Sequence, residues 1–244
     1  MRTAAILPVK RFARAKRRLG ASVADPLRDD LARAMVADVL VALSTSISIE
    51  RTIVVTQETS VMAAARSLGA LTVKDTAEES QSAAVILGVE SALTEGFERV
   101  LCIPGDCPAL DPAELDSLLD SASGAPGDTE PTAGARAVVI VPDRHGTGTN
   151  GLLLSPPDAI TPSFGPGSCE RHRALAHEAG AVCRIERPAS LLLDIDTGED
   201  LAALRERLAG GDGTGGARTR RVLGAARAAG GAQSTAAPST VTIT

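Results

Sequence analysis

Short apolar runs recur along most of the chain, separated by longer stretches whose apolar positions repeat with a helical period. The runs are strand-sized and rich in β-branched residues or Leu, a composition typical of buried strands. They cover residues 3–9, 51–56, 71–74, 99–103, 137–141 and 191–195. We therefore predict a strand at each of these places.

The longest amphipathic stretch covers residues 25–43. It begins with Asp25 as a candidate N-cap and Pro26 at the first helical position. Its apolar side chains fall on or near one stripe, formed by Leu27, Leu31, Met35 and Leu40. This pattern predicts a long helix.

Further helix signals lie between the other predicted strands. Gly69 and Gly180 stand where a left-handed C-terminal cap is expected, and residues 111–114 and 197–200 each form a capping arrangement that opens a helix. Strand and helix signals thus alternate along the chain. Such alternation favours an α/β fold with a mostly parallel sheet that helices cover on both faces.

Two regions depart from the alternation. Residues 121–136 are rich in Gly, Pro, Ser and Thr and predict a surface connection. Residues 210–244 form a Gly/Ala/Arg-rich tail with few side chains to bury, and we expect it to be disordered. The tail is either a solvated extension or a weak anion-binding arm.

Composition narrows the function classes. Of the 244 residues 44% are hydrophobic, but only three are Phe and none is Trp or Tyr; the net charge is −5. We therefore expect no nucleic-acid binding by base stacking. The four Cys show no CxxC spacing, no signal-peptide pattern is evident, and the apolar runs are too short to cross a bilayer. We expect a reduced, cytoplasmic protein without a membrane role.

The segment "IPGDCPALD" follows the predicted strand at residues 99–103. In an open parallel sheet, ligands bind beyond the carboxyl ends of the strands, where Asp106 would be exposed to a cleft. Gly105 allows a sharp turn or the close approach of a phosphate. Alternatively, this is an ordinary loop in which Asp106 caps a backbone amide.

Two more acids, Asp194 and Asp196, end the predicted strand at residues 191–195. Carboxylates that converge with Asp106 at strand ends would suit Mg²⁺, which takes the rest of its shell from water and substrate phosphates. The alternative is that one of the two acids caps the next helix, although Thr197 is better placed for that role.

A basic segment, "KRFARAKRRLG", follows the first predicted strand. Its position near the carboxylates favours a polyanion such as a triphosphate, held between cations and metal. An isolated basic run is more often a solvated face or a nucleic-acid patch, so its position is what favours phosphate.

Two small-residue loops could bind a further anion. "HGTGTNG" offers amides and the hydroxyls of Thr147 and Thr149, and "FGPGS" opens a helix whose first amides surround Ser168. The three His, including His145 and His172, show no zinc-binding spacing and suit packing or surface positions as well as catalysis.

Together these segments resemble the nucleotidyltransferases of the glycosyltransferase-A-like Rossmann type. They resemble more closely the guanylyltransferases of deazaflavin (coenzyme F-420) biosynthesis that use phosphoenolpyruvate or 2-phospho-L-lactate. The similarity spans residues 4–208 and rests on "LPVKRFARAKRRL", "PGDCPAL", "DRHGTGTN", "FGPGSCERHR" and "DIDTGEDL". It implies an α/β, single-domain, three-layer α/β/α Rossmann-like nucleotidyltransferase fold with a mostly parallel mixed sheet over residues 1–209.

The resemblance also implies roles for individual residues. In such enzymes the last Thr of the GTGT loop and the Gly and Ser of the FGPxS segment bind the phosphorylated acid; here these are Thr149, Gly165 and Ser168. The implied catalytic residues are Lys10, Lys16, Arg18 and Asp106, and the implied Mg²⁺ ligands are Asp106, Asp194 and Asp196. The implied nucleotide site comprises Pro8, Lys10, Lys16, Gln81, Ser82 and Gly105. Gln81 and Ser82 stand where many relatives carry a GLNxA motif.

The implied reaction moves GMP from GTP to the phosphate of the acid and releases pyrophosphate. A phosphate monoester is largely dianionic at neutral pH, so it needs no protein base to act as a nucleophile. The Ala/Arg/Gly-rich composition indicates a GC-rich bacterial source. Because bacterial relatives resemble the phosphoenolpyruvate type, this favours phosphoenolpyruvate over 2-phospho-L-lactate as the substrate. We expect small-molecule substrates, a monomer or homodimer, and, as a candidate protein partner, a downstream transferase of the pathway.

Two other functions remain open at this point. One is a nucleotidyltransferase of the same fold with another base or acceptor, such as a molybdopterin or a sugar phosphate. The other is a nucleotide-binding module without turnover. Pyrophosphate release with a panel of nucleotides and acceptors separates all three.

Overall fold

One seven-stranded sheet organises the protein. The computed structural model describes residues 1–12, 25–121, 136–210 and 215–234. The sheet has the order β3-β2-β1-β4-β6-β5-β7. Its strands are β1 (Thr3–Val9), β2 (Arg51–Thr56), β3 (Leu71–Lys74), β4 (Arg99–Cys102), β5 (Ala137–Pro142), β6 (Thr149–Ser155) and β7 (Val182–Ile185). All pairings are parallel except those of β6, which runs antiparallel to β4 and β5. The predicted mostly parallel mixed sheet is confirmed.

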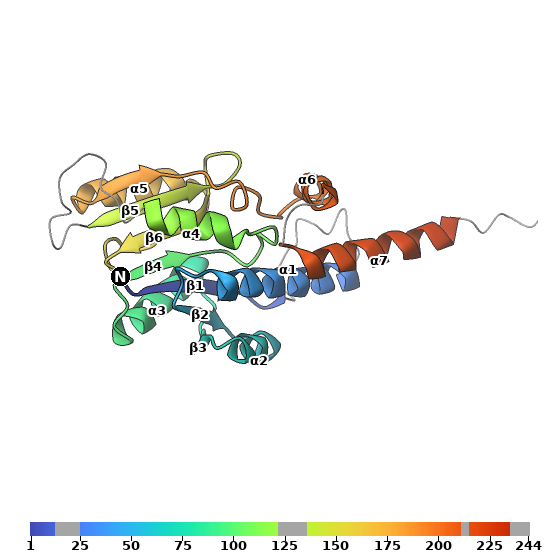
Figure 1. Cartoon of the computed structure of the whole chain (residues 1–244), viewed down its shortest axis with the longest axis horizontal. Helices are drawn as coiled ribbons and strands as arrows, with labels where there is room; N and C mark the ends of the chain where they lie inside the picture. Colours follow the sequence, from blue (N-terminus) through green and yellow to red (C-terminus); the bar gives the residue numbers. More distant parts are fainter. Residues whose placement is uncertain (13–24, 122–135, 211–214, 235–244) are drawn as a thin grey trace, which may run out of the picture.

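Helices cover both faces of the sheet (Figure 1). Alternate strand residues face opposite layers, so Leu7 and Leu101 contribute to one core cluster while Ile6 and Val100 contribute to the other. The first cluster packs under α1 (Asp25–Thr45), α2 (Thr59–Ser67) and α4 (Pro112–Ser121). The second packs under α3 (Gln81–Thr94) and α5 (Ser168–Glu178). The three-layer α/β/α architecture is therefore confirmed.

Strand register brings loops from distant parts of the chain to one edge. Ile6 of β1 pairs with Cys102 of β4, and Cys102 in turn pairs with Leu152 of β6. Because β6 is reversed, it begins at the edge where β4 and β5 end, with Thr149 opposite Pro142. The carboxyl edge of the sheet is thus also the start of β6.

The local helix signals act as predicted. Gly69 and Gly180 adopt positive φ angles of 75° and 63° at the ends of α2 and α5. The Asp111 carboxylate accepts a hydrogen bond from the Ala113 amide at 2.9 Å, at the start of α4. Thr197 and Asp200 form a reciprocal capping box at the start of α6 (Gly198–Ala209).

The strand prediction at residues 191–195 is wrong. This segment forms a turn followed by irregular chain, and the Leu191 amide donates to the Pro188 carbonyl. Its apolar character arises because Leu191 and Ile195 are fully buried in core clusters beside the sheet. The strands β6 and β7 were not predicted, since β6 opens with small polar residues that suggest a loop and β7 is short and partly exposed.

The prediction of a disordered tail is also wrong where the structure describes it. Residues Ala217–Ser234 form helix α7, which lies beside α1 (Figure 1). The buried Asp38 of α1 accepts hydrogen bonds from the amides of Arg218 at 3.1 Å and Thr219 at 2.8 Å. This carboxylate caps α7 from across the fold, and Leu223 is buried against Leu31 and Met35.

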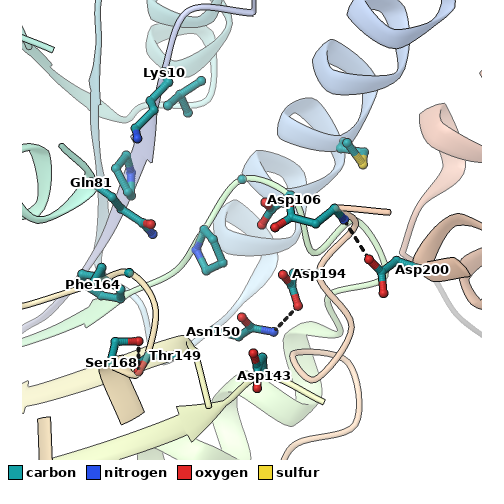
Figure 2. A pocket seen from close by; sticks show the side chains of 18 of the residues that line it. Lys10, Gln81, Asp106, Asp143, Thr149, Asn150, Phe164, Ser168, Asp194 and Asp200 are labelled. Carbon is teal, nitrogen blue, oxygen red and sulfur yellow. Dashed lines mark hydrogen bonds between the residues drawn. The ribbon is translucent and has the colours of Figure 1, made fainter. Parts of the chain in front are cut away.

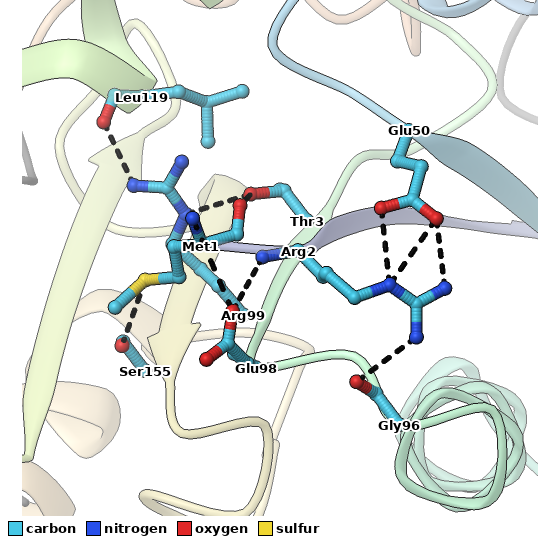
Figure 3. Close-up of polar contacts among 9 residues, drawn as sticks. All are labelled: Met1, Arg2, Thr3, Glu50, Gly96, Glu98, Arg99, Leu119 and Ser155. Atoms are coloured by element: carbon cyan, nitrogen blue, oxygen red, sulfur yellow. Dashed lines mark hydrogen bonds and ion pairs between the residues drawn. The ribbon is translucent and has the colours of Figure 1, made fainter.

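At the opposite, amino edge of the sheet, Arg2 and Arg99 form hydrogen bonds and an ion pair between neighbouring segments (Figure 3). The guanidinium of Arg2 binds Glu50 at 2.7 Å and the Glu95 carbonyl at 2.8 Å. The buried Arg99 donates to the Thr3 hydroxyl and the Leu119 carbonyl. Arg99 thus joins β4 to β1 and to α4, and Arg2 joins the residue before β1 to the segments before β2 and after α3.

Other predictions lie outside the described residues: most of the connection at 121–136, and Lys16 and Arg18 of the basic segment. None of the helices within the described ranges is both long and apolar enough to span a bilayer.

Candidate active site

A pocket of about 860 Å³ opens at the carboxyl edge of the sheet (Figure 2). Its walls come from the ends of β1 and β4, the start of α3, the hairpin between β5 and β6, and the segment before α6. The sequence-predicted residues that line it are Pro8, Lys10, Gln81, Gly105, Asp106, Thr149, Gly165, Ser168, Asp194 and Asp196. One pocket therefore gathers the predicted acceptor, nucleotide and metal residues that the structure describes, apart from Ser82.

The acidic side of the pocket forms where two loops are joined through their backbones. The Ile195 amide donates to the Asp106 carbonyl at 3.1 Å. This bond lies between Asp194 and Asp196 in the chain, so both acids stand beside the loop that carries Asp106. The predicted meeting of these segments is confirmed, although irregular chain rather than a strand brings it about.

Asp194 has an unusual electrostatic environment. Burial raises its pKa, and the nearby charge of Asp106 raises it further; a hydrogen bond from Asn150 works in the opposite direction. Asn150 Nδ2 donates to Asp194 Oδ1 at 3.1 Å (Figure 2). It also donates to the Leu191 carbonyl at 2.8 Å. Asn150 thus fixes the orientation of a carboxylate that repels its acidic neighbour.

The donor set of this acidic side suits Mg²⁺. Carboxylate oxygens are the hard ligands that this ion prefers, and one or two of them are enough because waters and substrate phosphates complete the octahedron. A divalent cation would also offset the repulsion that raises the pKa of Asp194. Within the described ranges, however, no three acidic, His or Cys side chains form a ready-made metal cluster. Asp106 and Asp194 are the residues that would hold the ion, with Asp196 close enough to influence Asp194.

A salt bridge braces this side of the pocket. Arg144 binds Asp200 at 2.8 Å, and it also reaches Glu199 at 3.3 Å. Burial alone would raise the pKa of Asp200, but hydrogen bonds from Thr197 and Asp196 and the charge of Arg144 lower it. Because the Asp196 amide donates to Asp200, the brace holds the acidic segment against the β5–β6 hairpin.

The GTGT loop owes its shape to Asp143. Its carboxylate accepts a hydrogen bond from the Thr147 amide at 2.9 Å, and its own amide donates to the Gly148 carbonyl at 3.3 Å. A side chain at Gly148 would meet Asp143, because a Cβ there would lie 2.7 Å from the carboxylate. The loop is therefore closed around an acid that the motif analysis did not single out.

A β-bulge aims the first residues of β6. Val141 pairs with Gly151 and Pro142 pairs with Thr149, so Asn150 is the extra residue. Thr149 contacts α5 through His172, whereas Asn150 contacts the segment before α6. Adjacent residues of one strand thus serve opposite sides of the pocket.

The predicted acceptor residues Thr149 and Ser168 are in direct contact. The Ser168 hydroxyl donates to Thr149 Oγ1 at 3.0 Å, and both side chains are buried at the start of α5 (Figure 2). The preceding loop needs glycine, since Gly165 and Gly167 have φ angles of 115° and 72°. The first two amides of α5, those of Ser168 and Cys169, donate to the carbonyls of Gly165 and Thr147, so the expected anion site on these amides is not open. The hydroxyls of Thr149 and Ser168 are the groups that can meet an anion here.

The predicted nucleotide residues that line the pocket are Pro8, Lys10, Gln81 and Gly105. A Cβ at Gly105 would lie 3.0 Å from Val36, so glycine lets the β4–α4 loop lie close to α1. Ser82 does not line the pocket; its hydroxyl accepts a hydrogen bond from the Phe164 amide at 2.8 Å. The geometry therefore gives Ser82 a supporting role instead of the predicted nucleotide contact.

Several supporting residues were given no role in the site from the sequence: Asp143, Arg144, Asn150 and Asp200, which line the pocket, and His172, which contacts Thr149. Their partners are distant in the chain or across a bulge, so spacing alone does not reveal them. Arg144 and Asn150 do flank the GTGT loop, and that position could have marked them.

Comparison with known proteins shows the family of this chain. A family model described as "Guanylyl transferase CofC like" matches residues 3–225. A phosphoenolpyruvate guanylyltransferase from Conexibacter woesei is 48% identical, covering 91% of this chain and 96% of that protein. A 2-phospho-L-lactate guanylyltransferase from Methanothermobacter thermautotrophicus is 33% identical, covering 88% and 87%.

The solved structure of a nucleotidyl transferase from Methanothermobacter has the same fold. It superimposes with a TM-score of 0.58 at 20% identity, covering 86% of this chain and 99% of that chain. Since the family match extends over nearly all described residues, the chain belongs to the guanylyl transferase CofC-like family.

Proposed function

We propose that this protein transfers GMP from GTP to the phosphate of phosphoenolpyruvate and releases pyrophosphate. The observation that carries the proposal is the single pocket that joins an acidic pair, Asp106 and Asp194, to the hydroxyl pair Thr149 and Ser168. The product would be enolpyruvyl-diphospho-guanosine, a precursor for deazaflavin coenzyme F-420.

The chemistry requires positioning more than a reactive side chain. A phosphate oxygen of the acid attacks the α-phosphorus of GTP, a new P–O bond forms, and the bond to the β-phosphate oxygen breaks. The phosphate monoester is already largely dianionic at pH 7, so no residue has to remove a proton. The task of the protein is to bring two anions together in line and to neutralise the developing charge.

The residues divide this task by position. Thr149, Ser168 and Gly165 bind the acid at the start of α5. Lys10, with Lys16 and Arg18 from outside the described ranges, would lie along the triphosphate. Gly105 presents backbone without a side chain, so the phosphates can approach the end of β4 closely.

Asp106 and Asp194, with Asp196 nearby, would hold Mg²⁺. When bound, the ion would supply positive charge for the α-phosphate and the leaving pyrophosphate. Asn150 keeps Asp194 turned toward the pocket, and the Arg144–Asp200 salt bridge keeps the acidic segment in place.

The choice of acid follows from the relatives. The Conexibacter relative, named for phosphoenolpyruvate, is more similar than the Methanothermobacter relative, named for 2-phospho-L-lactate. The two acids share the same phosphate and carboxylate and differ only in one carbon–carbon bond, which is double in phosphoenolpyruvate and single in 2-phospho-L-lactate. This similarity supports phosphoenolpyruvate as the substrate.

The test is incubation of the protein with GTP, Mg²⁺ and each acid in turn, with pyrophosphate release measured and the product identified by mass spectrometry. We expect the guanylylated product with phosphoenolpyruvate at a higher kcat/KM than with 2-phospho-L-lactate. ATP, CTP and UTP in place of GTP test base selectivity. If the protein releases no pyrophosphate from GTP in the presence of either acid, the proposal is contradicted.

A further inference from the structure

A buried histidine extends the hydroxyl pair of the acceptor side into a chain. His172 Nδ1 lies 3.1 Å from Thr149 Oγ1, which in turn lies 3.0 Å from Ser168 Oγ. On the other side of the ring, the Ser163 amide donates to His172 Nε2 at 2.9 Å. The imidazole is fully buried and packs edge-on against Phe164.

The Ser163 amide determines which ring nitrogen carries hydrogen. An amide N–H can only donate, so Nε2 must accept and carries no hydrogen. A neutral imidazole then has its hydrogen on Nδ1, which donates to Thr149 Oγ1. Burial and the charge of Arg171 lower the pKa of His172 to about 4, so the ring is neutral at physiological pH.

Counting hydrogens shows what this tautomer achieves. Three hydrogens are present: one on Nδ1, one on the Thr149 hydroxyl and one on the Ser168 hydroxyl. Only two hydrogen bonds link these three groups. One hydroxyl hydrogen is therefore left over. In the other tautomer Nδ1 would accept from Thr149, and both hydroxyl hydrogens would be used within the chain.

The surplus hydrogen can be directed into the pocket. Thr149 and Ser168 both line the pocket. Within the described ranges, neither hydroxyl has a hydrogen-bond partner other than His172 and the other hydroxyl of the pair. An anionic ligand needs donors, and a hydroxyl that already accepts a hydrogen bond donates more strongly.

From this geometry we propose that His172 is a positioning residue for the acceptor: the Ser163 amide fixes its Nδ1–H tautomer, and the tautomer presents one hydroxyl of the Thr149–Ser168 pair as a donor to the anionic acid. The proposal rests on the proposed function for the identity of the acid. The tautomer itself is a property of the free protein. His172 does not contact the reacting atoms.

The first test observes the tautomer directly. The chain has three His, so a His145→Gln, His177→Gln double variant leaves His172 as the only imidazole. Long-range ¹H–¹⁵N correlation spectra of this ¹⁵N-labelled protein at pH 7 distinguish the two ring nitrogens. We expect a protonated Nδ1 and an unprotonated Nε2. The opposite tautomer, or a doubly protonated ring, would overturn the proposal.

The second test separates positioning from general damage. His172→Gln should raise the KM for phosphoenolpyruvate at least about tenfold, the scale for a lost hydrogen bond to a charged group, while the KM for GTP stays within about twofold. His177→Gln, on the exposed side of the same helix, is the matched control and should change neither constant. Equal increases in both KM values for His172→Gln would indicate a structural role and contradict the proposal.

The outcomes distinguish this proposal from the proposed function. If the wild-type protein guanylylates neither acid, the identity of the ligand is wrong, while the spectra still decide the tautomer. If the wild-type protein is active but the spectra show the other tautomer, the proposed function is supported and the proposed role of His172 is contradicted.

Discussion

The buried imidazole of His172 makes a specific prediction about stability at mildly acidic pH. Its pKa is lowered from 6.5 to about 4 in the folded protein, first by burial and then by the charge of Arg171. In the unfolded chain, the imidazole of His172 therefore binds a proton below about pH 6.5, whereas in the folded protein it does so only near pH 4. Stability from this group is fully present above pH 6.5 and is lost as the pH falls toward 4.

The size of the effect follows from the two pKa values. One pKa unit corresponds to about 1.4 kcal/mol, so lowering the pH from 7 to 5 should remove about 2 kcal/mol of the free energy of unfolding through His172. Since folded domains are stable by only about 5–15 kcal/mol, this change is readily measured.

The assay is urea unfolding of wild type, His172→Gln and His177→Gln at pH 7 and pH 5. Glutamine does not titrate, so the pH-dependent loss should be about 2 kcal/mol smaller in His172→Gln than in wild type. The exposed His177 is the matched control, and its replacement should leave the loss unchanged. Comparing losses removes any constant destabilisation of the variant. Parallel losses in wild type and His172→Gln would refute the reasoning.

Three further substitutions test other parts of the structure. Asp106→Asn should keep the fold, judged by circular dichroism, and lower kcat by about 10² or more, the scale for a lost transition-state charge contact; turnover within a few-fold of wild type at saturating Mg²⁺ would exclude Asp106 as a ligand. Thr149→Ala should raise the KM for phosphoenolpyruvate roughly tenfold and leave GTP binding, measured by calorimetry, near normal; the reverse pattern would mean that the two subsites are interchanged. Asp38→Ala removes the cap from the amides of Arg218 and Thr219, so it should cost about 1–2 kcal/mol in urea unfolding; an unchanged midpoint would show that α7 does not depend on this contact.

Local signals were sufficient for most of the fold. Strand-sized apolar runs and helix caps such as Gly69 and Thr197 depend on neighbours in the chain, so their positions can be predicted from the sequence. Helix α7 could not be predicted in this way, because its cap is Asp38, about 180 residues away. An apolar run does not by itself distinguish a strand from a buried loop, and the segment containing Leu191 shows the difference.

In the candidate site, too, some residues can be predicted from neighbouring sequence and others only from tertiary contacts. Asp106 and Ser168 stand in recognisable motifs at the ends of regular elements, so the sequence marks them. The residues that orient them depend on tertiary contacts: His172 meets Thr149 across 23 positions, and Asn150 meets Asp194 across 44. Motifs therefore identify groups that would touch substrate, whereas the supporting hydrogen bonds require the structure.

The bulge at the start of β6 explains how one short strand contacts both sides of the pocket. Side chains alternate between the faces of a strand, so a regular pairing would place Asn150 on the same face as Leu152, toward α5. The extra residue shifts this alternation, so that Thr149 faces His172 of α5 while Asn150 faces Asp194. The acceptor hydroxyl and the support for the acidic pair are consequently adjacent in the chain and fixed relative to each other. In-line transfer requires this fixed relation, because an acceptor phosphate and a GTP α-phosphate misplaced by about 1 Å react much more slowly.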